Sequence, residues 1–232
     1  MASLAELARA HASLDETALS HLHTLVAEWQ MLADLSFADL LLYVRVTRQP
    51  APPEPTYLCI AQIRPTTGPT LYGEDLVGAT VTAADRFAVD RAWREVRIVR
   101  EGEPEWREGV PVREEGIPVR RGEDVIAVLG RDTNLAAART PSALELAYLA
   151  AASDLAQMVS EGRFPFVLGE GHLPGGPRVG DGLVRLDPVG NVVDVLIGRL
   201  RHKVDLPGMQ PLIHTRRGAG YQAADTESAD AV

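Results

Sequence analysis

The hydrophobic positions near the N-terminus follow a helical period. Between residues 16 and 35 they recur at steps of three and four, which places them on one face of an α-helix. They are Leu19, Leu22, Val26, Trp29 and Ala33. Asp15 precedes this segment, and its side-chain oxygen suits the N-cap position. The pattern therefore predicts an amphipathic helix over residues 16–35.

The pattern then changes to short runs rich in Leu, Val, Ile and Tyr. Two of these, residues 40–46 and 57–63, are separated by the breaker-rich stretch QPAPPEP, so two strands joined by a loop are predicted. A further short strand or two is predicted within residues 71–81. Residues 117–120 and 125–130 enclose a Gly-Glu-Asp turn, which predicts a β-hairpin.

Two more helices are expected farther along the chain. Thr82 suits the cap of a helix over about 83–94, and Thr140 with Pro141 opens a long helix that reaches about residue 162. One face of this last helix holds Leu144, Tyr148, Ala151, Leu155 and Met158. The Glu- and Arg-rich run over residues 94–121 is typical of a solvated face.

This order of elements predicts an α+β fold. Its sheet is mostly antiparallel and is flanked by a long helix at each end, which together fill residues 1–162. The two terminal helices can lie side by side and offer a coiled-coil-like face to a partner. Residues 163–190 are rich in Gly and Pro and are expected to form a linker. The acidic residues 223–232 are expected to be a disordered tail.

Composition narrows the functional classes. The chain has 232 residues, 46% of them hydrophobic, and a formal net charge of −9, which argues against a nucleic-acid interface over its whole surface. Cys59 is the single cysteine, so an internal disulfide and a cysteine-based zinc site are excluded and a reducing compartment is expected. Neither a secretory signal nor a membrane span is recognisable, so a cytoplasmic protein without membrane contact is expected.

Four segments carry a resemblance to a known family. They are HLHTLVAEWQMLADLSFADLLLYVR (21–45), AQIRPTTGPT (61–70), EDLVGATV (74–81) and IPVRRGEDVIAVLGRDT (117–133). In this order they resemble the N-terminal GAF sensor domain of the PdtaS-type sensor histidine kinases of actinobacteria, over residues 1–165. RVGDGLVRLDPVGNVV extends the resemblance to about residue 190 and looks like the start of a PAS domain.

The resemblance implies a GAF-like sheet and a small-molecule pocket between that sheet and its covering helices. In the family, these two domains precede a histidine-kinase core, and a response regulator receives the phosphate. A phosphoacceptor box and ATP-binding boxes are not recognisable in this chain. The expected role is therefore a non-catalytic sensing and interaction module of a phosphorelay, forming a homodimer or a heterodimer with a sensor kinase. No cofactor is expected.

A second resemblance begins at residue 191. NVVDVLIGRLRHKVD and PLIHTRRGAGY look like the recognition helix and the wing hairpin of an OmpR-type winged-helix domain, in which the helix enters the major groove of DNA. Residues 191–222 hold five basic residues against two acidic ones, and Gly218 with Gly220 suits a tight hairpin. The residues that this resemblance implies in DNA contact are Asn191, Arg199, Arg201, Lys203, His214, Thr215, Arg216 and Arg217.

Only part of a winged-helix domain is recognisable here. The sheet and the two helices that normally support the recognition helix do not precede Asn191, and about 30 residues cannot bury a core of their own. A transcriptional regulator that binds DNA through residues 191–222 is therefore the alternative function. A remnant of gene fusion is a third hypothesis, and an uncharacterised enzyme is the last.

Three smaller motifs have both a structural and a chemical interpretation. His21 and His23 are two apart, so on a helix they point about 200° apart and cannot share a metal. The resemblance to the family implies that a second cysteine can follow Cys59 by four residues and form a redox or metal-sensing pair, but that position is Ile63 here, and a buried structural thiol is favoured. The loop RPTTGPT (64–70) could bind an anion through its amides, but its Pro and Gly residues favour an ordinary turn. No catalytic or metal-binding constellation stands out, and no ligand-binding residue is identified.

Overall fold

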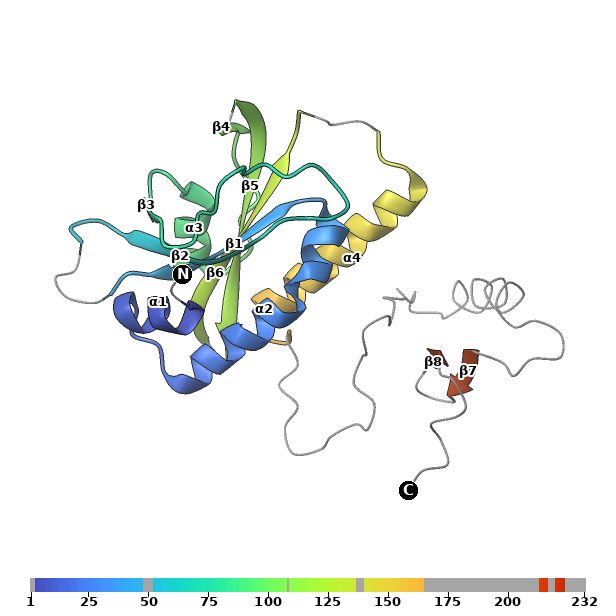
Figure 1. Cartoon of the computed structure of the whole chain (residues 1–232), viewed down its shortest axis with the longest axis horizontal. Helices are drawn as coiled ribbons and strands as arrows, with labels where there is room; N and C mark the ends of the chain where they lie inside the picture. The colour runs from blue at the N-terminus through green and yellow to red at the C-terminus, as the bar shows by residue number, and fades with distance from the viewer. Residues whose placement is uncertain are drawn as a thin grey trace, which may run out of the picture. The chain divides into compact units, whose positions relative to one another are not determined.

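A six-stranded antiparallel sheet forms the centre of the first structural unit (Figure 1). The computed structural model describes residues 3–47, 52–107, 109–136, 140–164, 213–216 and 220–223. The strands are β1 (Asp39–Arg45), β2 (Thr56–Ile63), β3 (Thr80–Thr82), β4 (Glu105–Arg107), β5 (Val110–Arg121) and β6 (Asp124–Asn134). Their order across the sheet is β3-β2-β1-β6-β5-β4, and every neighbouring pair is antiparallel.

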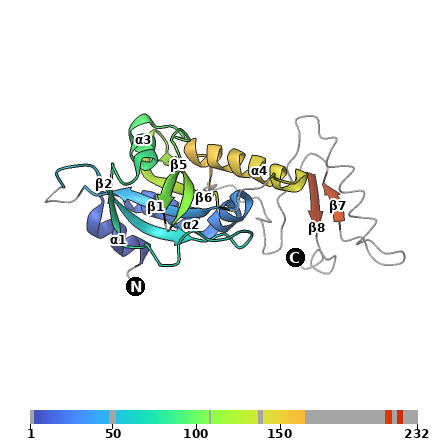
Figure 2. The same ribbon diagram turned by 90° about the horizontal axis from the view of Figure 1, so that it is seen from above.

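Helices cover both faces of this sheet. They are α1 (Leu4–His11), α2 (Glu16–Ser36), α3 (Phe87–Glu95) and α4 (Ala143–Ser160). Buried residues of α1, α2 and α4 share one hydrophobic core with the sheet, whereas α3 packs into a second core. Figure 2 shows α3 and α1 on opposite sides of the strands, and α2 lies against α4.

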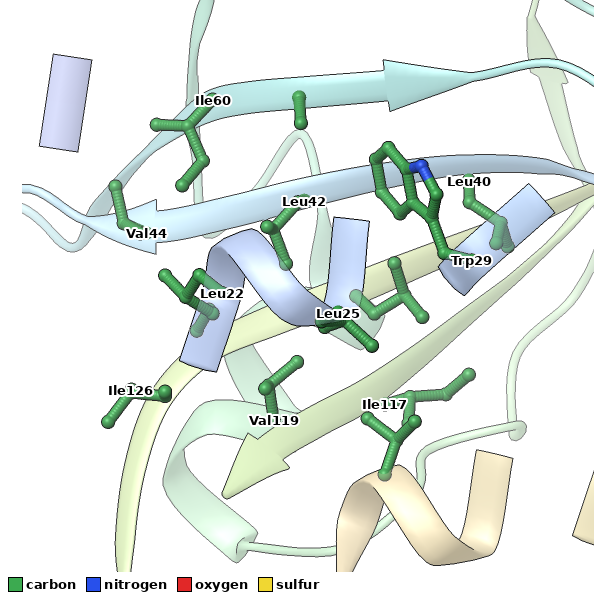
Figure 3. Packing of buried hydrophobic residues seen from close by; sticks show 14 of the residues in the cluster. Leu22, Leu25, Trp29, Leu40, Leu42, Val44, Ile60, Ile117, Val119 and Ile126 are labelled. Atoms are coloured by element: carbon green, nitrogen blue, oxygen red, sulfur yellow. The ribbon is translucent and has the colours of Figure 1, made fainter. Parts of the chain in front are cut away.

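Strand β1 is buried on both faces because it lies between the two cores. Leu40, Leu42 and Val44 face the α2 side, where they meet Leu22 and Trp29 (Figure 3). Its alternate residues, Leu41 and Tyr43, face the α3 side. This is the period of two that a strand imposes on its side chains, and it explains why the run appears continuously hydrophobic in the sequence.

The expected α+β class with an antiparallel sheet and long flanking helices is confirmed. The helix predicted over residues 16–35 is α2, and the Asp15 carboxylate caps it by accepting a hydrogen bond from the Ala18 amide at 2.6 Å. The two strands predicted at 40–46 and 57–63 are β1 and β2. The predicted hairpin is longer than expected, because β5 and β6 continue into the charged residues on both sides of it.

Three helix boundaries differ from the expectation. Helix α3 starts at Phe87 rather than near 83, because the Asp85 carboxylate accepts hydrogen bonds from the backbone and hydroxyl of Thr82 and holds a turn there. Helix α4 starts after Ser142, which forms a capping box with Glu145 and replaces the expected Thr140 start. Helix α1 was not predicted, although its N-terminus carries a Ser-x-x-Glu capping box.

The second structural unit, within residues 169–232, contains a β-hairpin of β7 (Ile213–Arg216) and β8 (Gly220–Ala223). It coincides with the predicted wing. The predicted recognition helix, the linker apart from its first two residues (163 and 164), and most of the acidic tail lie outside the described residues. In the part of the chain that is described, no helix is long and apolar enough to cross a membrane.

Candidate functional site

A cavity of about 280 Å³ lies on the α3 side of the sheet. Its wall combines two tyrosines, a cysteine, three aliphatic residues and two arginines. They are Tyr43, Cys59, Tyr72, Leu76, Ala79, Val81, Arg86 and Arg107. Among these described residues, the wall thus carries two cationic side chains and no carboxylate. A concave site of this kind, apolar with a few polar groups, is the usual form of a small-molecule site.

The segment between β2 and β3 forms one side of the cavity by folding back onto β2. The Cys59 amide donates to the Ala79 carbonyl at 3.0 Å, and the Gly78 amide donates to the Cys59 carbonyl at 2.8 Å. The Leu76 amide donates to Oε1 of Gln62 at 2.7 Å. These bonds hold Leu76 and Ala79 over the strand and fix the shape of the apolar wall.

Arg86 forms the polar floor together with Asp132. Its Nη1 lies 2.6 Å from Oδ2 of Asp132, and the two side chains are 3% and 0% exposed. Its Nη2 donates to the Tyr72 hydroxyl at 2.8 Å, and that hydroxyl donates to the Asp132 carboxylate. The guanidinium carbon lies 5.5 Å from the ring centroid of Tyr43 and 5.9 Å from that of Tyr72. Charge pairing and cation–π contact together offset the cost of burying this arginine.

Asp132 and the two tyrosines also shift the pKa of Arg86. Burial alone would lower the pKa of Arg86, but the nearby Asp132 carboxylate and the two tyrosines raise it well above its usual value. Burial raises the pKa of both Tyr43 and Tyr72. The floor of the cavity therefore carries a permanently charged guanidinium next to neutral phenols.

Arg107 occupies another part of the wall and has a different environment. Its Nη2 lies 2.6 Å from Oε2 of Glu105, 3.1 Å from Oε2 of Glu114 and 3.0 Å from the Asp85 carbonyl oxygen. Its side chain is 18% exposed, whereas that of Glu105 is 45% exposed. Three acceptors share one nitrogen, while the buried Nε has no hydrogen-bond partner among the described residues. The Nε of Arg86 is likewise buried without a partner in this described part of the chain, so the two arginines differ in the exposure of their carboxylate partners and not at this atom.

Glu114 lies between the two arginines, behind the wall. Its side chain is 6% exposed, and its Oε1 lies 4.0 Å from Nη1 of Arg86, too far for a hydrogen bond. The pKa of Glu114 is raised to about 7, chiefly by burial and also by the Asp132 charge, against the opposing effect of the two arginines. Near neutral pH this carboxyl is therefore close to the midpoint of its titration.

Cys59 is a free, buried cysteine, as expected. Burial raises the pKa of its thiol to about 12, and the thiol donates to the Ala61 carbonyl at 3.4 Å. Because the thiolate is the reactive form, this residue acts as part of the cavity wall. In the described residues, no group of three or more His, Cys, Asp and Glu side chains could hold a metal ion.

The other sequence motifs have structural roles. His21 is buried and His23 is exposed, on different sides of α2, as their spacing predicted. The loop 64–70 is held against α2, since the backbone amide and the hydroxyl of Thr66 both donate to Oδ1 of Asp34. Its interpretation as an ordinary turn is supported over anion binding.

The residues with an implied DNA contact are only partly within the described chain. His214, Thr215 and Arg216 lie on β7. The other residues of this set lie outside the described residues: Asn191, Arg199, Arg201, Lys203 and Arg217.

The charged residues in and behind the cavity wall were not predicted from the sequence. Arg86, Arg107, Glu114 and Asp132 come from four different elements and become neighbours only through the order of the strands. Arg107 and Glu114 belong to the Glu- and Arg-rich run that was interpreted as solvated. Arg86 lies directly before an amphipathic helix. A charged residue at that position was the one available sequence signal of a site, and it is a weak one.

Two curated sensor histidine kinases are similar in sequence to most of this chain. The sensor histidine kinase PdtaS of Mycolicibacterium smegmatis is 41% identical over 197 residues, which cover 83% of this chain and 38% of that protein. PdtaS of Mycobacterium tuberculosis is 40% identical over 199 residues, with the same two shares. The chain thus spans 38% of the length of these curated relatives.

A solved structure and one family model agree with these relatives, and a second family model matches the C-terminal residues. The structure titled "Sensor region of a sensor histidine kinase" is 39% identical, with a TM-score of 0.60 over 81% of this chain and 62% of that one. Residues 184–223 match the family "Transcriptional regulatory protein, C terminal". Residues 4–152, well over half of the chain, match the model of the histidine kinase PdtaS GAF domain. The chain therefore belongs to the PdtaS GAF-domain family.

Proposed function

We propose that residues 3–164 are a small-molecule sensing module of a two-component system and that the cavity on the α3 side is its ligand site. The observation that carries this proposal is the pair of arginines in the cavity wall, Arg86 and Arg107, which are held in place by buried carboxylates. An ordinary core does not bury such a cluster next to an open cavity, because desolvating each charge is costly. In this proposal the module binds and signals, and phosphoryl transfer belongs to a kinase partner.

The sheet offers a direct route from the cavity to the helices. Tyr43 is in the cavity wall, while its neighbours Leu42 and Val44 pack beneath α2 from the same strand. A ligand that moves β1 must therefore also move the core under α2, and α2 lies against α4. Close-packed cores transmit such shifts because they have little free volume.

Helix α4 is the proposed output surface. Its first half exposes Leu144, Leu146 and Tyr148, and the Tyr148 ring stacks on Phe37 at a centroid distance of 6.3 Å. Exposed apolar side chains gathered on one helix are typical of a protein contact. We expect this surface to form a homodimer or a mixed dimer with a sensor kinase, in the cytoplasm.

Ligand binding can be tested with the cavity blocked and unblocked. Ala79 is in the wall and exposed at the mouth, so Ala79→Phe should block entry. Ala10→Phe makes the same change on the exposed side of α1 and is the matched control. A screen of small metabolites by thermal shift should give compounds that stabilise the wild type and Ala10→Phe but not Ala79→Phe. Equal stabilisation of all three proteins would place the binding elsewhere and reject the proposal.

The alternative, DNA binding by the C-terminal segment, has its own supporting observation. Residues 184–223 match a DNA-regulator family and contain the β7–β8 hairpin at the wing position. This function predicts retardation of duplex DNA that weakens steeply with salt and is lost in Arg199→Ala and Arg201→Ala. If no duplex is retarded at low salt, the alternative is rejected.

A further inference from the structure

The charges around the cavity indicate what kind of molecule it would accept. The two charged residues of its wall, Arg86 and Arg107, are both cationic, and the carboxylates that balance them lie behind or outside the wall. Arg86 is neutralised at close range by the fully buried Asp132. Arg107 is paired at the same distance, 2.6 Å, but its partner Glu105 is half exposed, so solvent screens this attraction more strongly.

Glu114, the second partner of Arg107, is also a poor counter-ion. It makes one contact to Arg107 at 3.1 Å, while its other oxygen has no hydrogen-bond partner in the part of the chain that the structure describes. A carboxylate in this position gains little from its surroundings and is the group that a better-placed anion would displace. Arginine binds carboxylates most strongly through two parallel hydrogen bonds, which Glu114 does not make with either arginine.

The rest of the wall sets the size and polarity of the remaining part of the molecule. Tyr43 and Tyr72 present rings, and Leu76 and Val81 present aliphatic carbons. A volume of about 280 Å³ corresponds to roughly nine water-sized groups at about 30 Å³ each. This space suits a compact apolar body.

We propose that the cavity binds a small monocarboxylate with an apolar body, that Arg107 takes its carboxylate, and that Glu114 is the group displaced. This inference rests on the proposed sensing function and specifies the class of its ligand. The groups that face Glu114 are Arg86 from the start of α3, Asp132 from β6, and Arg107 and Glu105 from β4. Among them only Arg107 combines partial exposure with a place in the cavity wall.

The test uses the full chain and pairs of probes that differ in charge alone. Benzoate and isovalerate are titrated calorimetrically against their neutral amides, benzamide and isovaleramide, and against benzylamine as a cation. We expect a carboxylate to bind at least tenfold more tightly than its amide. In Arg107→Met this preference should disappear. In Arg113→Met it should remain, because Arg113 is exposed on β5, the strand that pairs with β4, and forms no ion pair within the described residues.

A second variant keeps the test decisive if Arg107→Met does not fold. Glu114→Gln removes the competing negative charge without removing a cation, so it should bind the carboxylate several-fold more tightly at pH 8. Unchanged or weaker binding in Glu114→Gln would overturn the displacement step.

The ligand class and the sensing function can be rejected separately. Binding of the amides or of benzylamine as tightly as the carboxylates would overturn the ligand class and leave the sensing function standing. If none of the probes, whether anionic, neutral or cationic, binds, and the metabolite screen is also negative, the sensing function itself is rejected.

Discussion

Gly116 and Gly130 are direct partners across the β5–β6 ladder, and each leaves room for a group on the α3 side of the sheet. A Cβ on Gly116 would lie 2.1 Å from the Ala88 carbonyl oxygen, and one on Gly130 would lie 3.1 Å from Cε2 of Tyr43. The first glycine sets how closely α3 approaches the sheet. The second sets the position of a ring in the cavity wall. The dimensions of the cavity therefore depend on two neighbouring positions without side chains.

Gly116→Ala should consequently destabilise the protein. The added methyl cannot be accommodated unless α3 shifts, because its nearest neighbour is backbone, and overpacking of this kind costs about 1–3 kcal/mol or more. Gly73→Ala is the control, since no described atom lies within 4 Å of a Cβ there; it should change stability by less than about 0.5 kcal/mol. Urea denaturation of both variants measures the difference. Equal stability of the two variants would show that α3 does not pack as described.

The buried pair of Arg86 and Asp132 gives a second prediction. Asp132→Asn leaves a guanidinium buried without its counter-charge, and removal of one partner from such a pair costs about 3–5 kcal/mol. Arg91→Met, which breaks the surface pair with Glu95, should have little effect. The double variant Arg86→Met/Asp132→Asn should be less destabilised than the sum of its single variants. Additive effects in this cycle, measured by chemical denaturation, would contradict a direct interaction.

Glu114 predicts how stability depends on pH. Its pKa in the folded protein is about 7, above the ordinary value of 4.5, so between these values the folded state binds more protons than the unfolded state. Stability must then fall as pH rises through this range. Glu114→Gln removes the effect, and its free energy of unfolding relative to the wild type should rise by about 1–3 kcal/mol from pH 5 to pH 8.

The control for this pH effect is Glu123→Gln. Glu123 has a side chain that is 99% exposed, so the difference in stability between this variant and the wild type should not vary over the same pH range. A parallel pH dependence of the wild type and Glu114→Gln would mean that Glu114 is ionised normally in the folded protein.

The exposed apolar residues in the first half of α4 give a prediction about assembly. Leu144→Glu adds a charge to an apolar surface, and charges are depleted from the cores of protein interfaces. We expect this variant to dissociate a dimer that Ala10→Glu leaves intact. Light scattering coupled to size-exclusion chromatography reads out the mass directly. A wild-type chain that is monomeric at high concentration, alone and with a sensor kinase, would contradict this role of α4.

The sequence identified the parts of the fold that depend on local patterns. The helical period of Leu22 and Trp29 located α2, and Asp15 located its start, because capping is a short-range interaction. The start of α3 could not be placed in this way, since Thr82 is an acceptable cap in the sequence but bonds to Asp85 instead. Whether a residue caps a helix or closes a turn depends on which hydrogen-bond partners the fold brings within its reach.

The cavity could not be predicted from local sequence patterns, for a related reason. Arg113 and Glu114 are neighbours in a charged run, yet Arg113 is exposed whereas the side chain of Glu114 is only 6% exposed. Their alternation is visible only once the strand extends through this run and α3 covers one of its faces. Long-range pairing, such as that of Asp132 with Arg86 forty-six positions away, leaves no periodic signal.

The central claim, that the cavity on the α3 side is a ligand site, is tested most directly by methyl NMR spectra. The compound with the largest thermal shift is titrated into the labelled protein while the methyl signals of Leu76, Ala79 and Val81 are monitored. These signals should shift in a saturable way, while those of Ala10 and Leu146 stay unchanged. Saturable shifts confined to Leu146, or to any region away from the cavity, would contradict the claim.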